Sequence, residues 1–139
     1  MAHVSRQFAS ELGQLAGMRA WVHEICSRAW GLKTEADALD QLVLAVQEAA
    51  TNVIRHACAD LPEQQIELDI DAAANEASVT IFHRGRDFDP HLAKQPVFDG
   101  SQEGGFGVYL IAHLVDEVDY FKDETGRSGI RLVKRRKES

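Results

Sequence analysis

The chain has 139 residues, of which 45% are hydrophobic and 27% charged, a balance typical of one globular domain with a single core. Its formal net charge of -7 argues against a protein that coats DNA or RNA, because phosphate binding requires Lys and Arg. No apolar run approaches the roughly 20 residues of a membrane span, and no signal-type stretch follows Met1. The sequence therefore predicts a cytoplasmic protein without membrane contact.

The charge is unevenly distributed. Residues 1–90 contain 7 Lys and Arg against 14 Asp and Glu, whereas residues 91–139 contain 8 of each. Residues 134–137 form a basic run, which is either a solvated strand end, the favoured interpretation, or a contact for an acidic partner. Cys26 and Cys58 are too few for a disulfide scaffold and lack zinc-type spacing, so we expect both to be small buried hydrophobic residues.

The first part of the chain predicts a short strand followed by two helices. Residues 4–9 fit a strand, and apolar spacing from about residue 10 to residue 30 predicts a helix that stops at Gly31. Thr34 is expected to cap a second helix that reaches about Cys58, with Asp37 in its acidic first turn.

After Pro62 the hydrophobic period changes to alternation. Residues 66–70 and 79–81 predict two strands with one wet face, joined through residues 72–75. A loop rich in Gly and Pro follows up to Gly107, then a third helix over residues 108–115, and a last pair of strands that turn near Gly126. Without repeats or linkers, residues 1–139 are expected to form a single α+β domain, a two-layer sandwich of helices on an antiparallel sheet.

The second predicted helix carries a line of polar residues nearly opposite its apolar side. Glu48, Asn52 and His56 follow i, i+4, i+8 spacing, flanked by the small residues Ala45 and Ala49, which would leave space for a ligand. Either these polar residues face water, or Asn52 binds Mg²⁺ in a metal–phosphate site where Glu48 accepts a proton from an attacking hydroxyl. The apolar stripe comprises Leu39, Leu42, Val43, Val46, Ala50, Val53 and Ala57.

Glycines at positions 104, 105 and 107 precede the third predicted helix. Backbone N–H groups at such a turn and at a helix N-terminus can cradle phosphate, while the alternative is a flexible loop without a ligand. The segment matches neither a Walker A motif nor a strand-first dinucleotide fingerprint. The preceding residues 91–103 are expected to form a lid over a nucleotide.

In their order and spacing, these segments resemble the GHKL-type ATP-binding domain, and within it the serine-protein kinase and anti-sigma factor family of bacterial partner-switching systems. Residues 48–57 resemble the family's N box, Gly85 with residues 88–90 its first glycine box, and residues 104–111 its second. Residues 114–120 and 130–135 are similar to its closing strands. The resemblance spans nearly the whole chain and favours the chemical interpretation of Glu48 and Asn52.

The resemblance implies a mixed, mostly antiparallel sheet with helices on one face, and ATP with Mg²⁺ between the second helix and the lid. It makes Glu48 the base that deprotonates the acceptor hydroxyl and Asn52 the Mg²⁺ ligand, and it places Arg55 and His56 near the phosphates or the ribose. The implied phosphate cradle comprises Gly104, Gly105 and Gly107, and Phe106 and Val108 are implied nucleotide-binding residues beside it.

One position departs from the family pattern. The family has an Asp that accepts the adenine amino proton two residues before the first glycine, where this chain has His83 before Gly85. A neutral imidazole has one acceptor nitrogen and is an imperfect replacement, whereas a protonated one cannot accept. Arg84 and Arg86 are either solvated or extra contacts to phosphate or a partner. Before the last strand, Ser128-Gly129 stands in place of a threonine–glycine feature.

The resemblance implies an ATP-dependent serine/threonine kinase that phosphorylates a STAS-domain anti-anti-sigma protein. It also implies that the kinase binds a sigma factor or another output protein, and that it forms a homodimer. The alternative, motivated by His83, is a binding module that keeps the fold, binds nucleotide weakly or not at all, and acts by sequestering partners. A third possibility, the ATPase piece of a sensor histidine kinase, is disfavoured because the chain has no room for a helical hairpin with a phosphoacceptor histidine.

Overall fold

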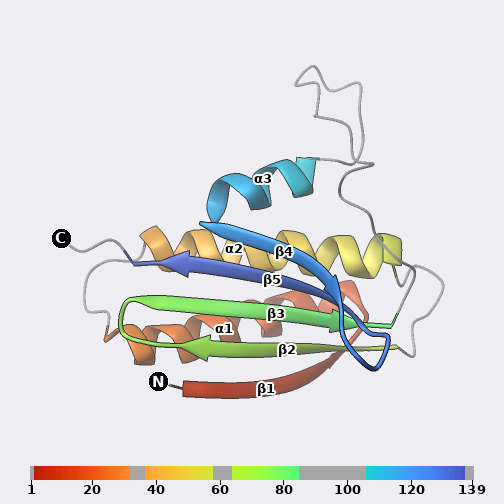
Figure 1. The fold of residues 1–139 in the computed structure, drawn as a ribbon, viewed down its shortest axis with the longest axis horizontal. Helices are drawn as coiled ribbons and strands as arrows, with labels where there is room; N and C mark the ends of the chain where they lie inside the picture. Colours follow the sequence, from red (N-terminus) through yellow and green to blue (C-terminus); the bar gives the residue numbers. More distant parts are fainter. Residues whose placement is uncertain (1, 32–36, 58–63, 85–105, 137–139) are drawn as a thin grey trace.

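The computed structural model describes residues 2–31, 37–57, 64–84 and 106–136 (Figure 1). The elements in chain order are β1 (Ala2–Ala9), α1 (Leu15–Trp30), α2 (Asp37–Asn52), β2 (Gln65–Ala72), β3 (Glu76–His83), α3 (Phe106–Leu114), β4 (Glu117–Lys122) and β5 (Ser128–Arg135). A 3₁₀ turn, Leu12–Gln14, precedes α1, and a π-helical turn, Val53–Ala57, follows α2. No helix within these ranges is long and apolar enough to cross a membrane.

The five strands form one sheet in the order β1-β2-β3-β5-β4, and each neighbouring pair is antiparallel. The hairpin between β2 and β3 turns through residues 73–75, as the alternating pattern predicts. The second hairpin, between β4 and β5, turns through Gly126, whose φ of 85° suits a residue without a Cβ atom. The predicted antiparallel α+β architecture is confirmed, and the described strands include no parallel pair.

Strand alternation gives the sheet one apolar face and one polar face. Helices α1 and α2 lie on the apolar side (Figure 1), which is where the core forms. The strands contribute Ile66, Leu68, Ile70, Val79, Ile81, Ile130 and Leu132 to this core, all of them buried. The opposite face, covered by no helix in the described part of the chain, carries mostly charged and hydroxyl side chains, which explains the half-wet strand pattern.

Helix α2 is packed on more than one side. Its predicted apolar stripe is buried from Leu39 to Val53, with Val43 partly buried, whereas the side chain of Ala57 lies outside the described residues. Ala45 and Ala49, expected to border open space for a ligand, are instead fully buried. The physical reason is that α2 contacts both α1 and α3, so its flank becomes a helix–helix interface.

Both long helices differ from their predicted bounds. Helix α1 begins at Leu15 rather than near residue 10, after the 3₁₀ turn, and ends as predicted at Gly31, which has a left-handed φ of 62°. Helix α2 leaves α geometry after Asn52, because residues 51–54 are all poor helix formers and the Thr51 hydroxyl donates to the Gln47 carbonyl at 2.7 Å. The predicted cap, Thr34, lies outside the described residues.

The basic residues near the C-terminus are neither simply solvated nor a free cationic patch. The Lys134 Nζ atom donates to the Leu114 carbonyl at 2.8 Å, and the Arg136 Nη1 atom donates to the Trp30 carbonyl at 2.7 Å. Leu114 and Trp30 are the last residues of α3 and α1, where cations stabilise the unpaired carbonyl groups. The described part of the run therefore fixes two helix ends, while Lys137 lies outside the described residues.

Cys26 lies on the buried side of α1, as predicted, and its side chain is shielded from solvent. Burial raises the pKa of its thiol to about 12, because the thiolate form is poorly solvated there. Cys26 is therefore a packing residue without nucleophilic character. Cys58 lies outside the described residues.

Candidate functional site

Four segments that are distant in sequence meet at one end of the molecule. Figure 1 shows the C-terminal end of α2, the C-terminal end of β3, the N-terminal end of α3 and the β4–β5 turn at this common end. Helices α2 and α3 are in direct contact. The segments that carry most of the predicted site residues are thus brought together.

Glu48 and Asn52 lie one turn apart on the last part of α2, and both are half-buried. Gln47 accepts a hydrogen bond from Arg19 of α1, so the opposite flank of α2, which includes Asn52, faces α3. Among the residues that the structure describes, neither Glu48 nor Asn52 has a side-chain hydrogen bond or ion pair. A carboxylate and an amide oxygen, both uncommitted, therefore lie one turn apart on a helix that contacts α3.

The π-helical turn begins directly after Asn52. Turns of this kind are rare in proteins, and those that occur often lie at functional sites. The turn contains Arg55, which is exposed, and His56, whose backbone alone is described. A π-helical turn has more residues per turn than an α-helix, so residues after Asn52 no longer follow the i, i+4, i+8 spacing along one side of the helix. The predicted polar line therefore holds for Glu48 and Asn52 but not for His56.

Helix α3 starts at Phe106, so the predicted residues Phe106, Gly107 and Val108 form its first turn. The unpaired backbone N–H groups of a helix N-terminus attract anions. The helix was predicted to begin at residue 108, but Gly107 lies within its first turn rather than before it. Gly104 and Gly105 lie outside the described residues, as do Gly85, Arg86 and the predicted lid over residues 91–103.

His83 is the last residue of β3 and is 2% exposed. Alternation along β3 directs its side chain to the helix side of the sheet, with Ser128 of β5 directly opposite it in the register. His83, which stands where the resemblance implies an Asp, is therefore the cross-strand neighbour of Ser128.

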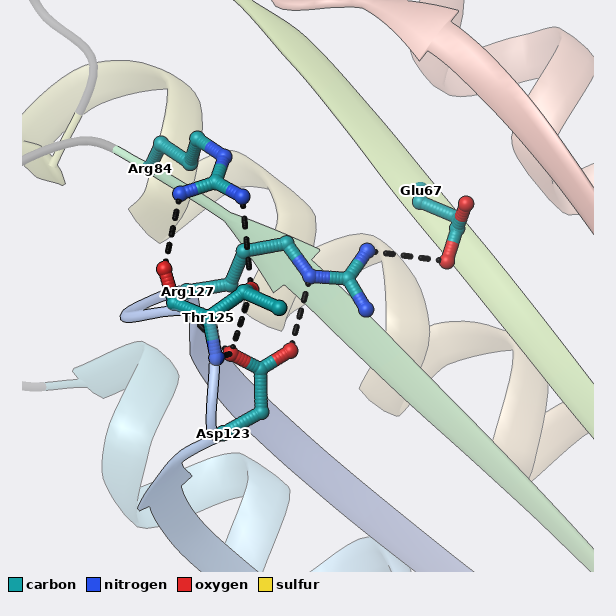
Figure 2. A network of polar contacts seen from close by, with 5 residues as sticks. All are labelled: Glu67, Arg84, Asp123, Thr125 and Arg127. Carbon is teal, nitrogen blue, oxygen red and sulfur yellow. Dashed lines mark hydrogen bonds and ion pairs between the residues drawn. The ribbon is translucent and has the colours of Figure 1, made fainter.

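A polar network at the β4–β5 turn was not predicted from the sequence (Figure 2). The Asp123 carboxylate accepts hydrogen bonds from the Thr125 N–H at 2.9 Å, the Thr125 hydroxyl at 2.7 Å and the Arg127 N–H at 2.9 Å. The Thr125 hydroxyl and the Arg127 guanidinium hold the pKa of the Asp123 carboxyl well below its usual range, and Asp123 in turn raises the pKa of Arg127. The local signal was present, since Asp before Thr and Gly is typical of a side-chain-closed turn.

A cavity of about 440 Å³ lies next to this network, at the same end of the molecule. Its lining comprises Gln7, Gln64, Gln65, Glu67, Phe82, His83, Arg84, Thr125 and Arg127. Most of these residues belong to the polar face of the sheet, so the cavity lies mainly on that face, and it reaches the predicted site residue His83 at the end of β3. Within the described ranges, no three His, Cys, Asp or Glu side chains gather to hold a metal ion.

Comparison with known proteins shows the family to which the chain belongs. Residues 8–134 match the family model described as the histidine kinase-like ATPase domain. Because the match covers most of the chain, this protein belongs to the histidine kinase-like ATPase domain family.

Its curated relatives include proteins named serine-protein kinase RsbW. The protein from Oceanobacillus iheyensis is 32% identical over 91 residues, which is 59% of this chain and 57% of the relative. Those from Listeria monocytogenes serovar 1/2a and Bacillus velezensis are 29% identical over 96 residues and 31% identical over 91 residues. These two matches cover 63% and 59% of this chain, and 61% and 56% of the relatives. The chain thus spans about three fifths of the length of these relatives.

A solved structure shares the fold. The crystal structure of the RsbU and RsbW domains of Rv1364c from Mycobacterium tuberculosis matches with a TM-score of 0.67 and 14% identity. The match covers 97% of this chain and 32% of that chain. The fold predicted from the sequence is therefore confirmed.

Proposed function

We propose that this protein is an ATP-dependent serine/threonine protein kinase of a bacterial partner-switching system. The observation that carries this proposal is the pair Glu48 and Asn52, one turn apart and uncommitted within the described residues, on the helix that contacts α3. Family membership supports ATP as the nucleotide, and the relatives named serine-protein kinase support protein as the acceptor.

Asn52 is the proposed Mg²⁺ ligand. Mg²⁺ prefers oxygen ligands and keeps several waters, so one amide oxygen with phosphate oxygens is a sufficient donor set. The half-buried, uncommitted side chain of Asn52 fits this requirement. When bound, the ion would neutralise charge on the ATP phosphates, while the proposed cradle of Gly104, Gly105 and Gly107 would supply backbone N–H groups. Phe106 and Val108 are proposed to bind the nucleotide next to this cradle.

Glu48 is the proposed catalytic base. As the acceptor hydroxyl oxygen forms its bond to the γ-phosphorus, the bond from that phosphorus to the β,γ-bridging oxygen breaks and ADP leaves. The hydroxyl proton passes to the Glu48 carboxylate. Arg55, exposed on the π-helical turn, and His56 are proposed to lie at the phosphate or ribose end, and His83 with Gly85 at the adenine.

The proposed acceptor is a serine or threonine on a STAS-domain anti-anti-sigma protein. The proposed second partner is a sigma factor or a similar output regulator, bound when the first partner is absent, and the proposed kinase is a homodimer. The excess of acidic residues in positions 1–90 is compatible with protein partners and unfavourable for nucleic acid.

A second candidate function is a binding module that acts only by sequestering partners. It is favoured by one observation, the buried His83 at the position where the family has the adenine-binding Asp. An imidazole offers one acceptor nitrogen where a carboxylate offers two oxygens, which weakens recognition of the adenine amino group.

Phosphate transfer separates the two candidates. The chain is mixed with Mg–ATP and the STAS protein encoded nearest to it, and the STAS protein is examined by intact mass spectrometry. We expect the mass of one phosphate to be added, and we expect Glu48→Gln to slow this addition by about 10²–10⁴-fold while leaving complex formation unchanged. Complex formation without transfer by the wild-type chain would refute the kinase and leave the binding module.

A further inference from the structure

The two residues that flank His83 are both held from the polar side of the sheet. His83 itself faces the helix layer, whereas its neighbour Phe82 faces the other way and Arg84 follows the end of β3. The Arg127 guanidinium lies 4.1 Å from the centre of the Phe82 ring. Two Arg84 donors reach Thr125, from Nη1 to its carbonyl at 3.1 Å and from Nη2 to its hydroxyl at 3.3 Å.

The part of the turn that holds Arg84 is itself fixed. Asp123 and Arg127 close the turn through a backbone hydrogen bond of 2.9 Å, in addition to the bonds that the Asp123 carboxylate accepts from Thr125 and from the Arg127 N–H. Gly126 donates its N–H to the Asp123 carbonyl at 3.1 Å. Thr125 is therefore presented to Arg84 in one position by bonds on both of its sides (Figure 2).

Arg127 links this turn to two neighbouring strands. Its Nε donates to Asp123 at 2.8 Å, and its Nη1 donates to Glu67 of β2 at 3.1 Å. The side chains of Arg127 and Glu67 are 28% and 25% exposed, so solvent screens this pair less than an ordinary surface ion pair. Because the guanidinium group is planar, bridging Asp123 and Glu67 also fixes its plane over Phe82.

We propose that Arg127, together with Arg84 and Thr125, clamps the C-terminal end of β3 and that Arg127 is thereby a positioning residue for His83 in nucleotide binding. This inference rests on the proposed function, in which His83 lies beside the adenine. Residues 82 and 84 cannot shift without breaking the contacts to Arg127 or Thr125, so the backbone of His83 is held between them. Arg127 acts through β3, because its guanidinium group is engaged by Asp123, Glu67 and the Phe82 ring.

The chain offers a matched control for Arg127. Arg135, near the other end of β5, pairs with Glu76 of β3 at 3.3 Å and with Glu117 of β4. It therefore bridges neighbouring strands as Arg127 does, but at the end of the sheet away from His83. If Arg127 only stabilised the sheet, replacing Arg127 and replacing Arg135 would change nucleotide affinity to the same extent.

The test is calorimetric titration of Arg127→Gln, Arg135→Gln and the wild-type chain with ATP and with ADP. We expect Arg127→Gln to weaken both nucleotides by the same factor, about five- to twentyfold, because the clamp acts at the base end rather than at the γ-phosphate. Arg135→Gln is expected to bind within about twofold of the wild type. Arg127→Lys, which keeps the charge without the planar fork, is expected to bind as weakly as Arg127→Gln.

The outcomes separate the clamp from the proposed function. A wild-type chain that binds neither nucleotide overturns the proposed function and the clamp together. Two results overturn the clamp alone, provided that the wild-type chain binds nucleotide. In the first, Arg127→Gln binds nucleotide with the affinity of the wild type. In the second, Arg135→Gln loses as much nucleotide affinity as Arg127→Gln. If Arg127→Gln does not fold, Thr125→Val decides by the same comparison, since it removes the hydroxyl bonded to Arg84 and Asp123 and keeps the Thr125 carbonyl.

Discussion

Removing the charge of Lys134 should destabilise the protein measurably, although this residue belongs to a basic run at the end of the chain. Its Nζ atom donates to the carbonyl of Leu114, the last residue of α3, and its side chain is half-buried. A charged donor at a partly buried helix C-terminus contributes about 1–2 kcal/mol. Lys134→Met keeps most of the alkyl stem, so the loss isolates the charge and the hydrogen bond.

The matched control is Arg131→Met on the same strand. Arg131 faces the polar side of the sheet, and its ion pair with Asp119 spans 3.8 Å between side chains that are 43% and 63% exposed. Such a pair contributes less than about 0.5 kcal/mol.

Urea unfolding followed by tryptophan fluorescence measures both losses. For a domain of this size, we expect the midpoint of Lys134→Met to fall by roughly 0.5–1 M without a change of slope, and that of Arg131→Met to stay near the wild type. Equal midpoints for the two variants would refute the assignment of Lys134 to the end of α3.

Three further predictions follow from the described contacts. A Cβ atom at Gly129 would overlap the Phe121 ring and displace the edge-on contact of Phe121 with Phe82. Gly129→Ala should therefore lower the unfolding free energy by about 1 kcal/mol. The same substitution should have no such effect in a Phe121→Ala background. Cys26, with its pKa raised to about 12, should resist a thiol reagent at pH 8 in the folded protein and react with it in urea. Mass spectrometry of the labelled chain measures both reactions. Rapid labelling of the folded protein would contradict the burial of Cys26. The pKa of Asp123 is lowered in the folded protein, so its stabilising effect is present above the ordinary carboxyl pKa and is lost as pH falls through the folded value. The difference in unfolding free energy between the wild type and Asp123→Asn should therefore stay constant from pH 8 to about pH 5 and shrink only below about pH 4. A difference that shrinks above about pH 5 would contradict the network.

The sheet and the ends of several elements could be predicted because their signals are local. Alternation over residues 66–70 and 79–81 predicted the first hairpin, and glycines at positions 31 and 126 marked turns that need a positive φ. Likewise, the spacing of Glu48 and Asn52 follows from α-helical geometry alone, which holds up to Asn52.

The remaining features depend on contacts between distant parts of the chain. Ala45 and Ala49 are buried because α1 and α3 flank α2, which a wheel drawn for a single helix does not show. Arg136 reaches Trp30 across 106 positions, and Arg127 reaches Glu67 across 60, so neither bond has a local signature. The π-helical turn after Asn52 could not be predicted, because the α-helix and the π-helix are closely related backbone forms. A run of poor helix formers is only a weak indication of the change from one to the other.

The central claim is that a nucleotide binds on the helix side of the sheet, at the end where α2, β3 and α3 meet. Titration of the ¹⁵N-labelled chain with Mg–ATP, followed through its backbone amide signals, tests this most directly. We predict shifts at Glu48, Asn52, His83 and the first turn of α3, and none at Ser78 or Arg131 on the polar face. Unchanged spectra at saturating Mg–ATP, or shifts confined to the polar face, would contradict the claim.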